Sequence, residues 1–428
     1  MKPAGRWVDF HIYDLDAGIT LFVQPTDRFK NTFLRMFVRS HLSEDASATA
    51  VLPHILMRGT RRRPTMAKVC AHLDTLFGSS ASADSGKIGE NQVLSFRVDA
   101  VNDRHLPGRS RNVRRGLEFL REMALDPARE GRELRHDYVE QEVHNQKRAL
   151  EDLMSDRAEW ASQRCVEEMC RGEAYAVHEM GSLEGLARAT PASITARHRE
   201  LLEKCPVEIY VAGRVKPDEI ATLCNDLFHA RVRRAPRQVP DTVVDVPVKS
   251  PRRITETMDV EQGKLVMGYR TYTTYRDRLS TALSFLNGIF GGFSHSRLFL
   301  NVREREGLAY SAGSSLEKTK GLLMVYAGID VEKFDKCLAV IGEELESIRA
   351  GKVTDEELEA TRKALSERAR GVLDSPSRAI YGLFERRLSG RVQTVEEVLK
   401  EIAATTKADV VEVANRVKLD LVYWLTRT

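Results

Sequence analysis

The sequence predicts an α+β protein made of two duplicated halves, each a mainly antiparallel sheet with helices packed on one face. Three observations support this prediction. Strand-like segments are grouped before and after helical stretches instead of alternating with them one by one. Landmarks in the first half recur in the same order about half a chain later. A proline-rich segment separates the two sets of landmarks, and the 428 residues suffice for two substantial cores.

Strands are predicted from apolar runs and from alternation of apolar and polar residues. Asp16-Ala17-Gly18 is a hairpin signal between the first two of them. In the first half the predicted strands are 7–13, 19–24, 32–39, 92–98 and 207–212. In the second half they are 255–260, 264–271, 309–316, 322–328 and 419–425.

Helices are predicted where apolar residues recur at spacings of three and four. One such pattern runs from Val113 to Ala124 and returns, with an offset of 221, from Phe334 to Leu345. Further helices should end at Phe77-Gly78 and at Phe290-Gly291, an offset of 213, and two more at Gly172 and Gly390, an offset of 218. Another helix opens at 354–357 with a Thr-Asp-Glu-Glu capping box. These recurrences indicate duplication.

The predicted domains follow from this pattern: an N-terminal half at 1–230, a linker at 231–253 and a C-terminal half at 254–428. The linker carries four of the 14 prolines, at 236, 240, 247 and 251. Such a composition is typical of an extended, semi-rigid connection.

Composition excludes several function classes. The net charge is only +4, and the basic runs at 61–63, 109–115 and 231–234 lack interleaved aromatic residues, so we expect no nucleic-acid partner. No run of 18 apolar residues occurs, so we expect no membrane span. The first residues lack an apolar signal core, and the six cysteines show no Cys-x-x-Cys spacing. A cytoplasmic, bacterial protein is the expectation.

The most informative motif is Arg303 with Tyr310, seven residues apart in the stretch SRLFLNVREREGLAY at 296–310. A guanidinium is always charged and donates in a rigid fork, and a phenol can donate to a developing oxyanion. The spacing suits residues that bracket a short turn near Glu306-Gly307, between a helix and a strand. The alternative is that Arg303 pairs with a neighbouring glutamate and Tyr310 packs on the sheet.

This stretch resembles the signature in the C-terminal half of the insulinase/pitrilysin family of zinc metallopeptidases, and the resemblance covers most of the chain. In that family the arginine and tyrosine of the motif hold the peptide substrate over the zinc. The resemblance therefore implies that Arg303 and Tyr310 bind substrate.

The metal motif of that family, His-x-x-Glu-His followed shortly by Gly-Thr, is degenerate here. Anchoring on Gly59-Thr60 puts Ala50 at the first His, Pro53 at the general-base Glu and His54 at the second His. The third ligand of the family aligns with Ala149. A lone His54 cannot form a catalytic site that needs three protein ligands, so no metal is expected on this chain. Pro53 lacks an N–H, so a helix should start or kink there.

Zinc could be rebuilt from other residues, and His136, Glu140 and His144 share one helix face. Solvated charged pairs are the simpler interpretation of that spacing. An autonomous peptidase with a new metal site is therefore the least favoured reading of the chain.

The resemblance implies the non-catalytic subunit of a heterodimeric zinc peptidase, with no catalytic residue of its own. The zinc would belong to a paralogous partner subunit, and a homodimer could form in isolation. The two chains would enclose a chamber for peptides or unfolded segments, into which this chain supplies Arg303 and Tyr310 in trans. The alternative is a structural, assembly or peptide-binding protein of the same fold without any role in catalysis.

Overall fold

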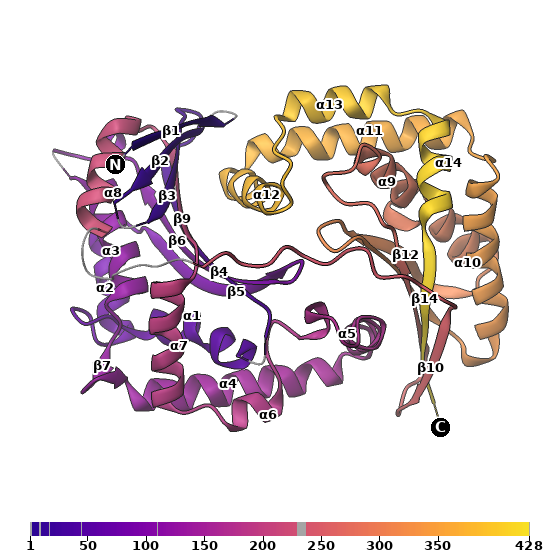
Figure 1. Ribbon diagram of the computed structural model, residues 1–428, viewed down its shortest axis with the longest axis horizontal. Coiled ribbons are helices and arrows are strands. Elements are labelled where there is room, and N and C mark those ends of the chain that lie inside the picture. The colour runs from indigo at the N-terminus through magenta and orange to yellow at the C-terminus, as the bar shows by residue number, and fades with distance from the viewer. Residues whose placement is uncertain are drawn as a thin grey trace. The chain divides into compact units, whose positions relative to one another are not determined.

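The chain forms two compact units in the computed structural model, which describes residues 2–7, 10–16, 18–43, 45–108, 110–228 and 237–427 (Figure 1). The first unit comprises Met1–Glu151 and Val177–Asp241, and the second comprises Asp152–Ala176 and Thr242–Thr428. The units thus differ from the expected halves because residues 152–176 group with the second unit. Positions 231–236 of the expected linker lie outside the described residues.

The sheet of the first unit is mixed but mainly antiparallel. Its order is β1-β2-β3-β9-β4-β6-β5, and only the pair β3 and β9 runs parallel. The strands are β1 (Lys2–Trp7), β2 (Phe10–Leu15), β3 (Ile19–Pro25), β4 (Asn31–His41), β5 (Ser80–Ile88), β6 (Asn91–Val101) and β9 (Val207–Gly213). A small separate hairpin pairs β7 (Arg129–Glu130) with β8 (Glu133–Leu134).

The sheet of the second unit repeats this topology. Its order is β10-β14-β11-β13-β12, again with one parallel pair, β10 and β14. The order matches β3-β9-β4-β6-β5 strand for strand, with the parallel pair in the same place, so the predicted duplication is confirmed. The strands are β10 (Arg252–Thr257), β11 (Gly263–Arg270), β12 (Ala309–Glu317), β13 (Leu322–Ile329) and β14 (Lys418–Thr426).

Several strand predictions differ from the structure. The strand expected at 7–13 corresponds to β2, which begins at Phe10, and the edge strand β1 before it was not predicted. The strand expected at 255–260 is β10, which begins at Arg252 because its parallel register with β14 pairs Arg252 with Leu421. The edge strand β5, with the sequence SASADSGKI, was not predicted. Its residues are mostly exposed or half-buried and polar, so it lacks the apolar run that marks a strand in sequence.

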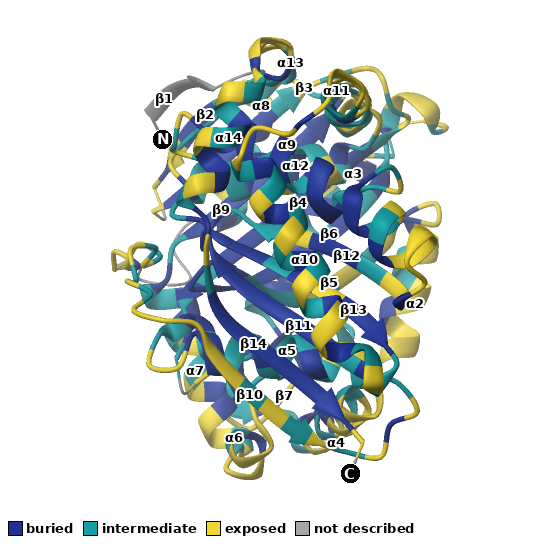
Figure 2. Ribbon diagram, turned by 90° about the vertical axis from the view of Figure 1, so that its right-hand side faces the viewer, coloured by how far each residue is buried: buried dark blue, intermediate teal, exposed yellow. Residues whose placement is uncertain are grey.

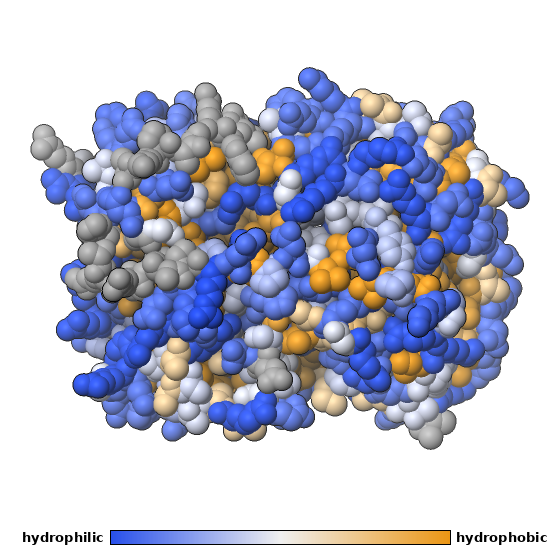
Figure 3. All heavy atoms as spheres, in the orientation of Figure 1, coloured by the Kyte–Doolittle hydropathy of each residue, from blue (hydrophilic) through white to orange (hydrophobic). Residues whose placement is uncertain are grey.

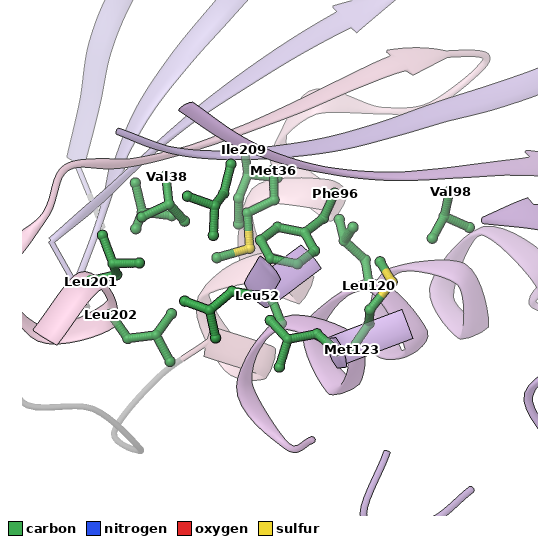
Figure 4. Close-up of a cluster of buried hydrophobic side chains, with 14 of the residues drawn as sticks. Met36, Val38, Leu52, Phe96, Val98, Leu120, Met123, Leu201, Leu202 and Ile209 are labelled. Atoms are coloured by element: carbon green, nitrogen blue, oxygen red, sulfur yellow. The ribbon is translucent and has the colours of Figure 1, made fainter. Parts of the chain in front are cut away.

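In the described part of the chain, seven helices pack on one face of the first sheet. Leu52, Leu120, Met123, Leu201 and Leu202 reach the sheet residues Met36, Val38, Phe96, Val98 and Ile209 in one buried cluster (Figure 4). The helices are α1 (Ala46–Arg58), α2 (Met66–Thr75), α3 (Asn112–Leu125), α4 (His136–Ser155), α6 (Leu183–Ala187), α7 (Pro191–Lys204) and α8 (Pro217–Phe228). The spacing from Val113 to Ala124 is thus the buried side of α3, as predicted.

Helices of the second unit lie mainly on one face of its sheet, where they bury β11 and β13. The opposite face is covered by α5, whose Ala161, Cys165 and Met169 pack on Val266 and Tyr423. Figure 2 shows β11 and β14 as buried strands. The helices are α5 (Arg157–Met169), α9 (Ser280–Asn287), α10 (Phe334–Arg349), α11 (Asp355–Gly371), α12 (Pro376–Leu388), α13 (Val395–Ala404) and α14 (Lys407–Arg416).

Local sequence signals account for several helix boundaries. The predicted capping box is present: the Thr354 side chain accepts from the backbone of Glu357, whose carboxylate accepts from the backbone of Thr354. After α2 the chain turns through Phe77 and Gly78, both with positive φ.

The face of the molecule seen in Figure 3 is mostly hydrophilic. Among the described residues, no helix has the length and apolar character needed to cross a membrane.

Candidate functional site

The helix that carries the degenerate metal motif is α1, and it does not begin at Pro53. It runs from Ala46 to Arg58 with Pro53 inside, so of the two expectations for Pro53, a helix start or a kink, the helix start was wrong. Ala46, Ser47, Thr49 and Ala50 form the earlier turns, and all are buried. Tertiary packing of this helix outweighs the lost N–H of Pro53.

The side chains at the metal positions offer a single ligand. Ala50 is fully buried and Pro53 is buried as well, while His54 is exposed. Neither a methyl group nor a pyrrolidine ring binds a metal, so only the imidazole of His54 could do so.

The fourth position, Ala149, lies half-buried on α4. Seven residues earlier on the same helix, the carboxylate of Glu142 accepts from the guanidinium of Arg58 on α1, which also donates to Gln141. This carboxylate is therefore already neutralised by a cation. Among the described residues, no group of three His, Cys, Asp or Glu side chains could hold a metal ion.

Purified chain should bind less than a tenth of an equivalent of zinc after dialysis, because Ala50, Pro53 and Ala149 provide no ligand. Restoring the first motif with Ala50→His and Pro53→Glu should not create a tight site, since the third ligand is still missing and position 50 is fully buried. Inductively coupled plasma mass spectrometry measures the metal. One tightly held zinc per wild-type chain, together with chelator-sensitive proteolysis, would refute this account.

Arg303 lies near the end of the π-helix η4 (Leu298–Arg305). Its guanidinium stacks over the Phe299 ring, 4.7 Å from the centroid, and its Nε lies 3.5 Å from Glu304 Oε1. The side chain is 42% exposed. The expected alternative, pairing with a neighbouring glutamate, is thus present, but it leaves much of the guanidinium open to solvent.

Tyr310 is the extra residue of a β-bulge on the edge strand β12. The register pairs Ala309 with Ile329 and Ser311 with Gly328, so Tyr310 has no partner on β13. Bulges of this kind re-aim a side chain, and Tyr310 is 61% exposed, so it does not pack on the sheet. Its hydroxyl donates to Asp330 Oδ1 at 3.3 Å.

Asp330 is held in place by Lys333. The Lys333 ammonium lies 2.9 Å from Asp330 Oδ2 and also donates to the carbonyl of Gly307 at 3.1 Å. The hydrogen bond from Lys333 lowers the pKa of Asp330, so this carboxylate is charged at neutral pH and accepts from Tyr310. This hydrogen bond orients the phenol, and Tyr310 must release Asp330 before its single O–H can donate to a ligand.

The segment between 298 and 311 turns at Gly307, whose φ of 56° glycine adopts at little cost. This is the predicted turn between a helix and a strand. Two uncommon backbone features flank this turn, the π-helix η4 and the bulge at Tyr310. Such features cost free energy and concentrate at functional sites, so this segment is the best candidate site in the described part of the chain.

Asp330 and Lys333 were not identified from sequence. In the antiparallel hairpin Tyr310 and Asp330 follow the paired residues Ala309 and Ile329 in opposite directions, so a regular register would not have predicted their contact. The observed register includes the bulge, which no residue pattern announces.

Comparisons with known proteins match this chain to an inactive-domain family model and to relatives described as metalloproteases or zinc proteases. A family model described as the peptidase M16 inactive domain matches residues 188–365. The chain is 32% identical over 417 residues, 96% of each chain, to a Bacillus subtilis protein described as the probable inactive metalloprotease YmfF. It is also 31% identical over 241 residues, 55% of each chain, to a protein of Mycobacterium bovis described as an uncharacterized zinc protease.

Solved structures show the same fold. A conserved protein from Enterococcus faecalis is 28% identical, with a TM-score of 0.91 over 98% of this chain and 99% of that one. A structure from Pseudomonas fluorescens described as a peptidase M16 inactive domain has a TM-score of 0.79 at 15% identity, over 98% of this chain and 99% of its own.

Proposed function

This chain belongs to the peptidase M16 family, the family of insulinase and pitrilysin, and we propose that it is the non-catalytic subunit of a heterodimeric zinc peptidase of the cytoplasm. It binds peptide in a chamber shared with a zinc-bearing paralogue. Arg303 and Tyr310 act there in trans, on a substrate carbonyl near the partner's zinc. This chain supplies no zinc ligand and cleaves nothing alone.

One observation carries the proposal: the two motifs differ in what their side chains can still do. At the metal positions, Ala50 and Pro53 are buried and bind nothing. At the other motif, Tyr310 is exposed and oriented by Asp330, and Arg303 is partly exposed. A subunit with a purely structural role has no need to keep a phenol and a guanidinium available in this way.

The chemistry of these groups suits a peptide substrate. When its O–H leaves Asp330, the phenol of Tyr310 can donate to an oxygen on which negative charge develops, and the guanidinium of Arg303 can bind a carbonyl or carboxylate. The name of the Bacillus subtilis relative, a probable inactive metalloprotease, supports a chain without its own activity.

The test is reconstitution with the M16 paralogue of the same genome that keeps an intact His-x-x-Glu-His motif. Each chain is purified separately and mixed, size-exclusion chromatography measures pairing, and a fluorogenic peptide measures hydrolysis. We expect a mixed dimer that hydrolyses peptide at least tenfold faster than either chain alone. Full activity of the paralogue without this chain, or no pairing, would contradict the proposal and favour the structural alternative.

A further inference from the structure

A second site lies within the second unit, away from Arg303 and Tyr310. It is a cavity of about 380 Å³ bordered by β12 and by the helices α9, α11, α12 and α13, which gather in the same region of Figure 1. This volume is in the range of small-molecule sites. Its residues play no part in the proposed function.

The charge of the cavity wall has one sign. Among the described residues that line the cavity, Lys318, Arg368 and Arg386 are basic and none is acidic. Arg368 and Arg386 make no hydrogen bond or ion pair with any part of the chain that the structure describes. An exposed guanidinium at Arg368 and a second one at Arg386, which has Glu385 as an electrostatic neighbour, lie beside a buried ammonium and favour an anion.

Lys318 is anchored in the wall of the cavity. Its Nζ donates to the Ser280 carbonyl at 2.6 Å and to Ser284 Oγ at 2.6 Å, and it faces the Tyr275 ring at 5.4 Å from the centroid. Burial lowers its pKa to about 7. No carboxylate pairs with this ammonium among the described residues, and a bound anion would favour its charged form.

The carboxylates near the cavity do not cancel its charge. Burial raises the pKa of Glu317 and of Glu385, and the carboxylate of Glu385 interacts electrostatically with Arg386 and Lys318. Glu401 is already paired, because it accepts from Arg391, Gln393 and Thr281. Glu385 offsets part of the charge of Arg386 and Lys318, while Arg368 has no carboxylate partner among the described residues, so the wall keeps a positive side for an anion.

The rest of the wall is divided between hydroxyl groups and apolar side chains. Ser280, Thr281, Ser284, Ser314 and Ser315 supply hydroxyls, and the apolar part consists of Phe293, Leu316, Leu365, Val372, Val398 and Ile402. Inorganic phosphate would leave this apolar surface empty. We propose that the cavity binds a small amphipathic carboxylate, whose charged group meets Lys318, Arg368 and Arg386 and whose apolar body lies on this surface.

Isothermal titration calorimetry at pH 7 with octanoate tests the proposal. We expect saturable binding of one octanoate per chain. Arg386→Gln should weaken it roughly 10- to 100-fold, because a hydrogen bond to a charged group is lost. Arg378→Gln is the matched control, since it lies on the same helix α12 but does not line the cavity, and it should leave the affinity unchanged. Arg368→Gln provides a second test should Arg386→Gln disturb the fold.

Two further probes separate the parts of the ligand. Octanamide keeps the apolar body without the charge, and inorganic phosphate keeps a charge without the body; both should bind at least tenfold more weakly than octanoate. No saturable octanoate binding, equal affinity for octanamide, or an equal loss in Arg378→Gln would overturn the proposal. Equal affinity for phosphate would overturn the assignment of an apolar body.

Discussion

Glu173→Gln is expected to lower the free energy of unfolding of the second unit by about 3–5 kcal/mol, the cost of removing one partner from a buried charge network. The Glu173 carboxylate binds two cations. Arg270 donates to it from both terminal nitrogens at 2.6 and 3.0 Å, and the Lys320 Nζ lies 2.6 Å away. Arg270 is 1% exposed and Lys320 is fully buried, so a neutral amide leaves both charges under-compensated.

The network also explains why residues 152–176 belong with the second sheet. Arg270 on β11 donates to the Met169 carbonyl and to Asp420 on β14 as well as to Glu173. One guanidinium thus joins two strands to the segment that contains α5. Urea unfolding of Glu173→Gln measures the effect.

Glu167→Gln is the control, because Glu167 lies on α5 in a partly exposed pair with Arg164 and such pairs contribute at most about 1 kcal/mol. Equal stability of the two variants would show that the network does not hold this segment.

Stability should depend on pH through the same carboxylate. Burial alone would raise the pKa of Glu173, but the hydrogen bonds from Arg270 and Lys320 outweigh it and lower the pKa. A lowered pKa means that the stabilisation is complete above the unfolded value of about 4.3 and is lost as the pH falls through the folded value. The difference between wild type and Glu173→Gln should therefore shrink below about pH 4.

The fold could largely be predicted because its signals are local or repeated. The 3–4 spacing in α3 and α10, the capping box at Thr354 and the glycine turns each follow from a few neighbouring residues. The same order of landmarks occurs twice, so each half supports the assignment of the corresponding elements in the other half. The two sets of elements together then predict the topology.

The features that sequence did not predict depend on distant contacts. Residues 152–176 begin in the last turn of α4, yet they pack on the second sheet through Arg270, a residue about a hundred positions away. Pro53 is a helix breaker by intrinsic preference, but buried neighbours keep it inside α1. Neither the packing of residues 152–176 on the second sheet nor the place of Pro53 inside α1 follows from the residues adjacent in sequence.

The assignment of Arg303 and Tyr310 to a site stays a prediction from the sequence, and the geometry around them was not predicted. The motif identified Arg303 and Tyr310 and the turn between them. The π-helix, the bulge and the carboxylate of Asp330 that orients the phenol depend on hydrogen bonds between strands and turns, which the motif does not specify.

Removing either substrate-holding group should strongly reduce turnover of the mixed dimer. Arg303→Ala and Tyr310→Phe should each lower kcat by about 10²–10³, the usual effect of losing one donor to a developing oxyanion. The loss should fall on kcat because the donor acts when charge develops on the substrate oxygen. Tyr310→Phe deletes a single hydroxyl from an exposed ring, so folding and pairing should be unaffected.

Matched variants separate this role from surface effects. Arg305→Ala removes an exposed arginine two residues along the same π-helix, and Tyr326→Phe deletes the hydroxyl of an exposed tyrosine on the neighbouring strand β13. Both should keep kcat within about twofold of the wild-type value, since neither position belongs to the motif.

The most direct measurement is kcat for peptide hydrolysis by the reconstituted heterodimer containing Tyr310→Phe, compared with the dimer containing Tyr326→Phe. Size-exclusion chromatography first confirms that both pair with the zinc-bearing subunit. The proposed function predicts a loss of about 10²–10³ for Tyr310→Phe alone. Wild-type kcat in the Tyr310→Phe dimer would contradict it and identify this chain as a structural partner without a part in catalysis.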